Sequence, residues 1–225
     1  IVYLAGYLLR QEKQVQNQIR GFLKPLMVLA VITFLLLREP DFGAATVILV
    51  TSLGMLFLAG VRIWQFIILL TGVAVVLGTL AISSPYRLAR LTTFLNPWAN
   101  QFDSGYQLTQ SLIAFGRGGW VGVGLGESIQ KLFYLPEAHT DFLFAVLTEE
   151  LGLIGGLFMI LLFSLLVWRA LYIGYRCFNI GQRFSAYLAY GIGLNIALQV
   201  MINIGVNTIV FFIWIYYFHI LLNRV

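Results

Sequence analysis

The sequence predicts an all-α polytopic membrane protein, a bundle of about six to seven transmembrane helices with one long extracytoplasmic loop. Of its 225 residues, 60% are hydrophobic and only 10% are charged, and the mean hydropathy is +0.89. Soluble domains carry about 25% charged residues, so the composition excludes a water-soluble fold. Several apolar runs also approach the roughly 20 residues that a helix needs to cross a bilayer. The net charge of +5 follows membrane topology and does not indicate nucleic acid binding.

Apolar runs bounded by charged or glycine-containing turns predict the individual spans. Ile1–Leu9 is apolar but has neither a basic flank nor a cleavage site, so we interpret it as part of a helix and not as a signal peptide. We expect a single integral membrane domain over residues 1–225. The full spans are expected at Phe22–Leu37, Phe42–Gly60, Ile63–Ile82, Phe142–Leu171 and Ser185–Val206, with a last one near Ile209–Leu222.

Basic residues gather in connections that lie on one side of the predicted bundle. The positive-inside rule assigns that side to the cytoplasm. The opposite side then holds the turn Arg38–Gly43 and the long loop 83–141, where a functional site is expected because loops of this length are often functional. Charges in the turn can pair with one another or contribute to that site. The basic connections are Arg10–Lys24, Arg62, Arg169–Arg183 and Arg224.

The chain from Leu188 to Leu222 is almost uninterruptedly apolar. Roughly 35 residues would form a helix of about 52 Å, which is too long for one crossing. Two crossings need a polar connection, and Asn207-Thr208 is too short to supply it. We therefore expect that a segment is missing after Asn207.

The long loop contains a glycine-rich stretch, Phe115–Gly126, after the segment Tyr106–Phe115, which predicts a short interfacial helix. Glycine-rich loops can bring backbone N–H groups close to phosphate oxygens. Here no strand precedes the glycines and no Lys-Ser/Thr follows them, unlike in a P-loop. Tight folding of the loop at the membrane surface explains the glycines equally well. Arg117, among them, can bind a phosphate through two parallel hydrogen bonds or pair with an acid of the loop.

Three titratable residues, Glu137, His139 and Asp141, crowd together where the loop meets the next span. Thr140 or Asp141 can cap the helix that follows, but capping explains one acid and not the cluster. The spacing is not a recognised zinc pattern. Coordination of Mg²⁺ beside a pyrophosphate is the metal role that these groups fit better.

Glu149 and Glu150 lie about 12–14 Å deeper along the predicted helix than Asp141. A carboxylate inside a bilayer is costly, so each needs a partner or a function. Adjacent side chains on a helix point in different directions, so the two cannot share one partner equally. We expect an ion pair for at least one of them, with an arginine on another span. Gly152 and Gly156, four residues apart, predict tight helix packing.

A resemblance to a known family rests on four stretches that follow one another in the family's order. They resemble the SEDS family of bacterial cell-wall proteins, over roughly Gly21–Asn207. Two shorter elements, AFGRGGW and LPEAHTD, are closer to the FtsW branch of cell division than to the RodA branch of elongation. The family fold has ten helices, so this chain is expected to be a fragment of it. The four stretches are REPDFGAA, NPWANQFDSGYQLTQSLIAFGRGGW, GVGLGESIQKLFYLPEAHTDFLFAVLTEELG and INIGVN.

The resemblance implies a peptidoglycan glycosyltransferase that polymerises lipid II into β-1,4 glycan strands. It would act at the outer face of the bacterial cytoplasmic (inner) membrane, at the division septum. The implied partners are a class B penicillin-binding protein (an FtsI-like transpeptidase) and other divisome proteins. Two alternatives remain: a lipid II flippase, which needs a polar path through the bundle, and a noncatalytic divisome scaffold.

The resemblance also implies roles for individual residues. Asp141 matches the essential aspartate of the family's HTD element and is the expected catalytic base. The candidates for holding pyrophosphate, alone or with Mg²⁺ or another divalent cation, are Lys131, Arg117, Arg87 and Arg90. Gln110 and Tyr106 are expected to contact sugar hydroxyls, and Glu137, His139 and Glu150 to support the site.

Overall fold

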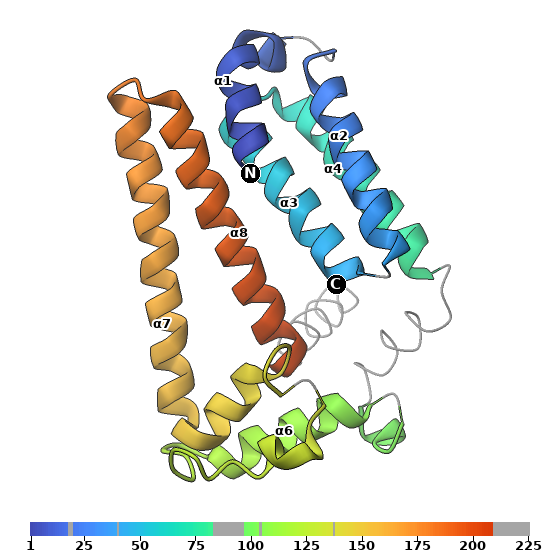
Figure 1. Cartoon of the computed structure of the whole chain (residues 1–225), viewed down its shortest axis with the longest axis vertical. Coiled ribbons are helices and arrows are strands. Elements are labelled where there is room, and N and C mark those ends of the chain that lie inside the picture. Colours follow the sequence, from blue (N-terminus) through green and yellow to red (C-terminus); the bar gives the residue numbers. More distant parts are fainter. Residues whose placement is uncertain (18–19, 40, 83–96, 104, 137, 209–225) are drawn as a thin grey trace, which may run out of the picture. The chain divides into compact units, whose positions relative to one another are not determined.

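The computed structural model describes residues 1–17, 20–39, 41–82, 97–103, 105–136 and 138–208. Every regular element within these ranges is a helix, which confirms the all-α class. The chain divides into two compact units, and Figure 1 shows their helices. Unit 1 comprises Ile1–Leu80 with Phe163–Gln199, and unit 2 comprises Ala81–Leu162 with Val200–Val225.

Each full span predicted before residue 209 corresponds to one helix. By length and hydropathy α7 and α8 qualify as membrane spans, while α3 and α4 contribute the shorter apolar segments Gly43–Leu58 and Ile63–Val76. The span predicted near Ile209–Leu222, and the chain after the expected junction, lie outside the described residues. The helices are α2 (Arg20–Arg38), α3 (Phe42–Leu58), α4 (Ile63–Ile82), α7 (Leu143–Asn179) and α8 (Arg183–Thr208).

Two helices continue through segments that were predicted to be connections. Helix α1 (Val2–Asn17) enters the polar segment and bends at Gln11, where φ is −122° and ψ is 21°. Helix α7 passes through Arg169 and ends only at Asn179. Arginine and glutamine are good helix formers, so a polar stretch does not by itself end a helix.

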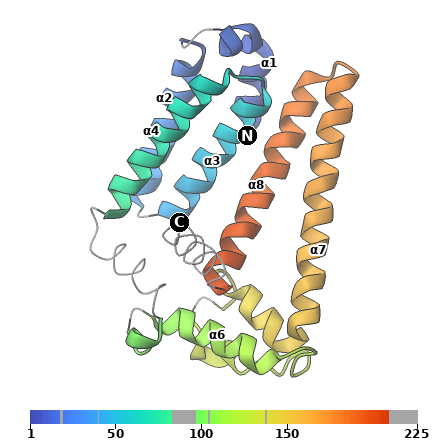
Figure 2. The same ribbon diagram turned by 180° about the vertical axis from the view of Figure 1, so that it is seen from behind.

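Within unit 1, the C-terminal part of α7 and the N-terminal part of α8 form an antiparallel hairpin, also visible from behind in Figure 2. Gly174 faces the ring of Tyr190, where an added Cβ would lie 2.6 Å from Cδ1. Gly181, with φ of 83°, lies in the tight turn between the helices. Small residues at such a contact let two membrane helices approach closely.

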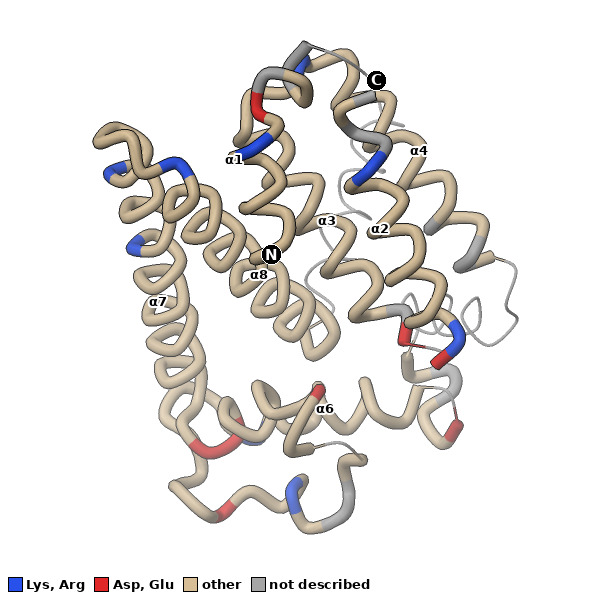
Figure 3. The backbone as a smooth tube through the Cα atoms, turned by 45° about the horizontal axis from the view of Figure 1, so that its top comes forward, with Lys and Arg blue, Asp and Glu red and all other residues tan. Residues whose placement is uncertain are grey.

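Charged residues lie mainly near helix ends and in the loop, and Figure 3 shows long stretches of α7 and α8 without them. The turn after α2 uses its charges locally. The Asp41 Oδ1 accepts a hydrogen bond from the Ala44 N–H at 2.9 Å and so caps α3. The Arg38 guanidinium lies over the Phe34 ring, 5.2 Å from its centroid. Among the described residues this turn contains no ion pair, so of the two explanations for its charges the structure does not support pairing across the turn.

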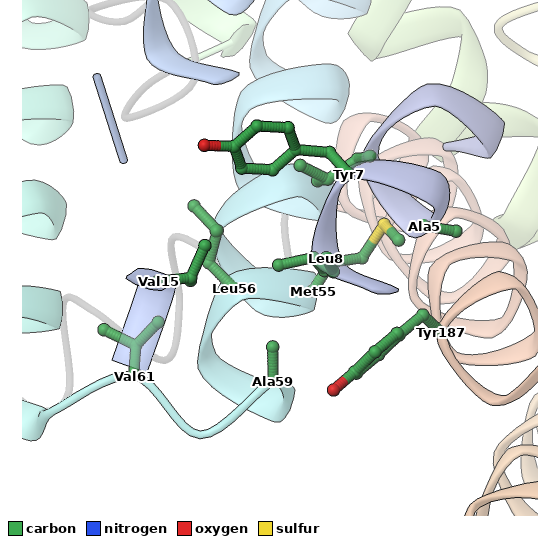
Figure 4. Close-up of a cluster of buried hydrophobic side chains, with 10 residues drawn as sticks. Ala5, Tyr7, Leu8, Val15, Met55, Leu56, Ala59, Val61 and Tyr187 are labelled. Atoms are coloured by element: carbon green, nitrogen blue, oxygen red, sulfur yellow. The ribbon is translucent and has the colours of Figure 1, made fainter. Parts of the chain in front are cut away.

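The core of unit 1 joins α1, α3 and the start of α8 (Figure 4). Leu8 and Leu56 are fully buried there, and Tyr187 of α8 packs beside them. The Tyr7 hydroxyl donates to the Gly21 carbonyl at 2.7 Å. Between membrane helices the stabilisation comes from such close packing and hydrogen bonds, because lipid is as apolar as the side chains.

Unit 2 contains the described part of the long loop, and that part is folded. The predicted interfacial helix is confirmed as α6 (Tyr106–Gly118). A 3-10 turn, η1 (Pro97–Asn100), precedes it, and a single π-helical turn, η2 (Gln130–Tyr134), follows. A buried apolar cluster fixes α6 against the start of α7, and its members are Ala114, Leu135, Ala138, Phe142 and Ala145.

Candidate active site

Helix α7 is broken at Gly152, where φ is 71° and ψ is −173°. The first turns of α7 therefore run at an angle to the rest of the helix (Figure 1). In a continuous helix the Leu153 N–H would bind the Glu149 carbonyl, and the Ile154 N–H would bind the Glu150 carbonyl. The kink separates both pairs, so four backbone groups need other partners.

The loop Gly119–Gly124, called the glycine loop below, supplies all four partners. It follows α6 directly and lies against the kink, so that each broken helical bond is replaced by two bonds to the loop. The Val123 and Gly124 N–H groups donate to the carbonyls of Glu149 (3.0 Å) and Glu150 (3.1 Å), and the Leu153 and Ile154 N–H groups donate to the carbonyls of Gly119 (2.9 Å) and Trp120 (3.2 Å).

This close approach of two backbones requires glycine at three positions. A Cβ on Gly118 would collide with the Thr148 carbonyl, and one on Gly122 would collide with the Glu150 carbonyl. A Cβ on Gly152 would meet the Gly122 N and the Trp120 carbonyl. Of the two interpretations of the glycine-rich stretch, the structure therefore supports tight folding, because the N–H groups of Gly122, Val123 and Gly124 are bound to main-chain carbonyls.

Glu149 is the most buried charged residue of the site, with no exposed surface. Its Oε1 accepts a hydrogen bond from the Arg117 Nη1 at 2.7 Å. Its Oε2 accepts one from the Ser128 Oγ at 2.5 Å and one from the Gln130 N–H at 3.3 Å. Both oxygens are thus satisfied, as a buried carboxylate requires.

Glu150 points to a different partner. Its Oε1 accepts from the Lys131 Nζ at 2.7 Å. The expected ion pairing of the glutamates is confirmed, with a separate partner for each. The expected source of the arginine is wrong, because Arg117 belongs to α6 in the loop and not to another span.

The two ion pairs reduce the positive charge that Arg117 and Lys131, both candidate phosphate ligands, can offer to a phosphate. Each cation already lies 2.7 Å from a carboxylate oxygen. Their side chains keep 37% and 28% of their surface exposed. A phosphate approaching them would therefore meet a neutral ion pair and not an isolated cation.

Asp141 precedes α7, from which Phe142 separates it, and its side chain is exposed. Its carboxylate makes no hydrogen bond or ion pair with the described part of the chain. Its main-chain carbonyl, by contrast, accepts from the Asn207 Nδ2 at 2.7 Å and from the Asn203 Nδ2 at 3.1 Å. The Ala145 N–H, in the first turn of α7, donates to the Asn207 Oδ1 at 3.1 Å. This first-turn N–H is thus capped by the side chain of Asn207 and not by that of Asp141.

The other predicted site residues are placed as follows. Tyr106 and Gln110 are half-buried on α6, and His139 is exposed between η2 and α7. Arg87, Arg90 and Glu137 lie outside the described residues. Four residues of the site were not among the predicted site residues, although all of them lie in the stretches that carry the family resemblance: Asn203, Asn207, Ser128 and Glu149.

The residues that the structure describes do not form a metal site. Among them, no group of three or more His, Cys, Asp and Glu side chains is arranged to hold a metal ion. His139 and Asp141 are two of the three ligands considered from the sequence, and the third, Glu137, is not described.

The fold and the site define an all-helical membrane protein in which a folded loop binds two acidic residues of a kinked helix. The chain belongs to the family of cell cycle proteins FtsW, RodA and SpoVE, the SEDS family, whose family model matches residues 1–211. This membership makes it a polytopic membrane protein, as the sequence predicted.

Several curated relatives are similar over nearly the whole chain. A probable peptidoglycan glycosyltransferase FtsW of Coxiella burnetii is 65% identical over 207 residues, which is 92% of this chain and 56% of that protein. The protein of the same name in Legionella pneumophila is 61% identical over 207 residues, covering 92% of this chain and 52% of that protein. The chain therefore spans about half the length of these relatives.

Proposed function

We propose that the protein is a peptidoglycan glycosyltransferase of cell division that polymerises lipid II at the outer face of the cytoplasmic membrane. The names of its relatives and its membership of the SEDS family support this activity. The single structural observation that carries the proposal is the exposed Asp141 carboxylate, at the start of α7, on a main chain held by two asparagine side chains.

In the proposed reaction, the 4-hydroxyl of GlcNAc in one lipid II attacks C1 of MurNAc at the end of the growing chain. The new O4–C1 bond forms as the bond from C1 to the pyrophosphate oxygen breaks. Undecaprenyl pyrophosphate leaves with the electron pair. An α-linked phosphate becomes a β-1,4 glycoside, so one in-line displacement with inversion is sufficient.

This displacement needs one base and not the two carboxylates of a retaining glycosidase. Asp141 is the proposed base and takes the proton of the attacking hydroxyl. Its exposure supports this role, because a base must come within about 2.6–3.2 Å of the proton donor. Tyr106 and Gln110 are proposed to contact sugar hydroxyls, with His139, Glu137 and Glu150 supporting the site.

The pyrophosphate of the leaving group needs positive charge as it departs. Arg87 and Arg90 are proposed ligands, and Arg117 and Lys131 would act through donors that their glutamates leave free. Mg²⁺ or another divalent cation would supply further charge. The proposed partners are a class B penicillin-binding protein and other divisome proteins at the septum.

A lipid II flippase is the main alternative, and it needs polar groups that line a path through the bundle. The sequence places only two charges, Glu149 and Glu150, clearly at such a depth, and its milder polar groups there are Asn195, Gln199 and Asn203. Both glutamates are engaged by the loop through Arg117, Ser128 and Lys131. Carboxylates that are already paired with residues of the loop are not available to line a path for a pyrophosphate headgroup.

The test compares Asp141→Asn with Asp103→Asn in the full-length protein, co-purified with its penicillin-binding partner. Asp103 is also an exposed aspartate of unit 2, so its variant controls for the loss of one surface charge. Loss of a general base lowers the rate by about 10²–10⁴-fold. We expect polymerisation of labelled lipid II to fall by this factor for Asp141→Asn and to persist for Asp103→Asn, with lipid II binding retained by both.

Polymerisation by Asp141→Asn at the rate of the unchanged protein would refute the catalytic assignment. Normal formation of glycan strands by both Asp141→Asn and Asp103→Asn would support the alternative of a noncatalytic scaffold.

A further inference from the structure

We infer that Asn207 and Asn203 are positioning residues for Asp141, which fix its main chain and relieve its side chain of helix capping. The inference rests on the proposed function and deepens it. Both asparagines lie in the last two turns of α8, and both belong to unit 2 together with Asp141.

The side-chain amide of Asn207 acts both as a hydrogen-bond donor and as an acceptor. Its Nδ2 donates to the Asp141 carbonyl at 2.7 Å and also to the Asn203 carbonyl at 2.7 Å. Its Oδ1 accepts from the Ala145 N–H at 3.1 Å. The side chain therefore spans the first turn of α7 and binds the residues before and inside it.

Asn207 is itself held in place. It has no exposed surface, and its own carbonyl accepts a hydrogen bond from the Ser111 Oγ of α6 at 2.9 Å. Burial makes its bonds costly to lose, because the groups left behind would remain unsatisfied. The start of α7 is thereby tied to α6 through a single residue of α8, whose side chain binds α7 and whose main-chain carbonyl binds α6.

Asn203 adds a second bond to the same carbonyl. Its Nδ2 lies 3.1 Å from the Asp141 O and 3.4 Å from the Thr140 O. Unlike the Asn207 side chain, the Asn203 side chain provides only a donor in this network. The two residues can therefore be separated by mutation, since Asn203 holds the main chain without capping the helix.

The functional consequence follows from helix chemistry. The first N–H groups of a helix lack partners within the helix, and a Ser, Thr, Asp or Asn at its start usually binds one of them. Asp141 is such a residue by type, and it lies one position before Phe142, whose carbonyl accepts the first bond of the helix from the Val146 N–H. Because Asn207 supplies an acceptor instead, the Asp141 carboxylate stays exposed and available to a substrate.

Position matters for a short side chain. A shift of the Asp141 backbone moves its carboxylate by nearly the same amount, because only two rotatable bonds lie between them. A misplacement of about 1 Å can cost about 100-fold in rate. Two hydrogen bonds to the carbonyl of the same residue oppose such a shift.

The test begins with three variants of the full-length protein in complex with its penicillin-binding partner. Asn203→Ala removes one donor to the Asp141 carbonyl. Asn207→Asp keeps an acceptor for the Ala145 N–H but removes the other donor. Asn195→Ala, on the same helix but in unit 1, is the matched control.

We expect kcat of lipid II polymerisation to fall about ten- to 100-fold in both site variants, with KM within about twofold of the unchanged value and normal kinetics for Asn195→Ala. Asn203→Gln, which keeps an amide donor, is expected to recover part of the lost rate. In an Asp141→Asn background, Asn203→Ala should cause no further loss, because a positioning residue acts through the group that it positions.

Three results would overturn the inference: kcat unchanged in both variants, a rise in KM alone, or a further loss in the Asp141→Asn background. A rate loss that only parallels a lower Tm or weaker partner binding would also count against it. Failure of the proposed function is distinguishable, since Asp141→Asn would then stay active. In that case the positioning role is tested by amide hydrogen exchange of the peptide Phe142–Val146. If Asn207 fixes this segment, its amides should exchange faster in Asn207→Ala than in Asn195→Ala.

Discussion

At the scale of single residues, the buried carboxylate of Glu149 imposes the strictest requirements on its surroundings. A charge without exposed surface is stable only when it is paired and fully hydrogen-bonded. Arg117, Ser128 and the Gln130 main chain meet this condition. Glu150, whose side chain is 15% exposed, depends less on its partner because water can compensate for part of a loss.

This difference predicts unequal effects of removing the two cations. Arg117→Ala leaves a buried carboxylate with one charged partner fewer and is expected to destabilise the protein by about 2 kcal/mol. Lys131→Ala is expected to cost less than about 1 kcal/mol, because the pair is more exposed. Thermal unfolding of the solubilised full-length protein measures both changes.

The double variant Arg117→Ala/Glu149→Gln is the control for this prediction, because it removes the charge together with its partner. It should be more stable than Arg117→Ala alone. Equal destabilisation by Arg117→Ala and Lys131→Ala would contradict the argument that burial of Glu149 sets the energy.

The sequence predicts part of this arrangement. The depth of Glu149 and Glu150 in an apolar run requires partners, so ion pairing follows from their position alone. The choice of partners does not, because Arg117 reaches Glu149 only through a loop that turns back onto the helix. Four glycines of that region have positive φ, namely Gly119, Gly122, Gly124 and Gly126, and no periodicity in the sequence specifies such a path.

At the scale of elements, the kink in α7 and the glycine loop form one structural unit. Neither could exist alone, because each supplies the hydrogen-bond partners that the other lacks. Gly152 was predicted to serve helix packing together with Gly156. That prediction is wrong for Gly152, which instead admits the main chain of Trp120 and Gly122.

Substitution at the kink should therefore be severe. Gly152→Ala places a Cβ in contact with the loop and forces φ of 71° on a residue that rarely adopts it. We expect a loss of at least about 3 kcal/mol of stability and loss of polymerisation. Thermal unfolding and the glycan assay on the full-length complex test both.

Gly116→Ala is the matched control for this prediction. Gly116 lies in α6, an added Cβ there meets nothing within 4 Å, and its φ is not positive. Alanine should stabilise the helix there by about 0.5–1 kcal/mol. A tolerated Gly152→Ala would mean that the kink is not required, and the docking of the loop would need another explanation.

The helices themselves were largely predictable. Helix α4 has the predicted bounds, and α3 begins at the predicted residue, because charged or glycine-containing turns bound these apolar runs. The end of α7 was not predictable in the same way. Arginines near a helix C-terminus favour the helix and interact well with its dipole, so Arg169 marks an exit from the apolar run and not the end of the helix.

At the scale of the whole molecule, the distribution of basic residues determines the expected orientation in the membrane. The α7–α8 turn lies beside Arg176 and Arg183, and the positive-inside rule assigns it to the cytoplasm. From the kink at Gly152 to its end at Asn179, α7 is long enough, at about 40 Å, to cross the bilayer and leave the arginines in water. If α7 crosses the bilayer in this way, we expect the glycine loop on the opposite side, where lipid II is expected.

A pair of single cysteines tests this orientation. Cys177 is the only cysteine of the chain, so the full-length protein with it and any others replaced by serine provides the background. Leu125→Cys, next to the glycine loop, and Gln182→Cys, in the α7–α8 turn, are both at exposed positions. In spheroplasts, a membrane-impermeant maleimide should label Leu125→Cys, and it should label Gln182→Cys only after permeabilisation.

The two positions make the test symmetrical, because a general failure of labelling or a leaky membrane would affect both alike. The reverse pattern would place the Asp141 region in the cytoplasm. Lipid II polymerisation at the outer face would then be impossible for this site, whatever the effect of Asp141→Asn on the purified complex. The predicted pattern would instead place the site on the side of the membrane where the glycan is built, which the proposed chemistry requires.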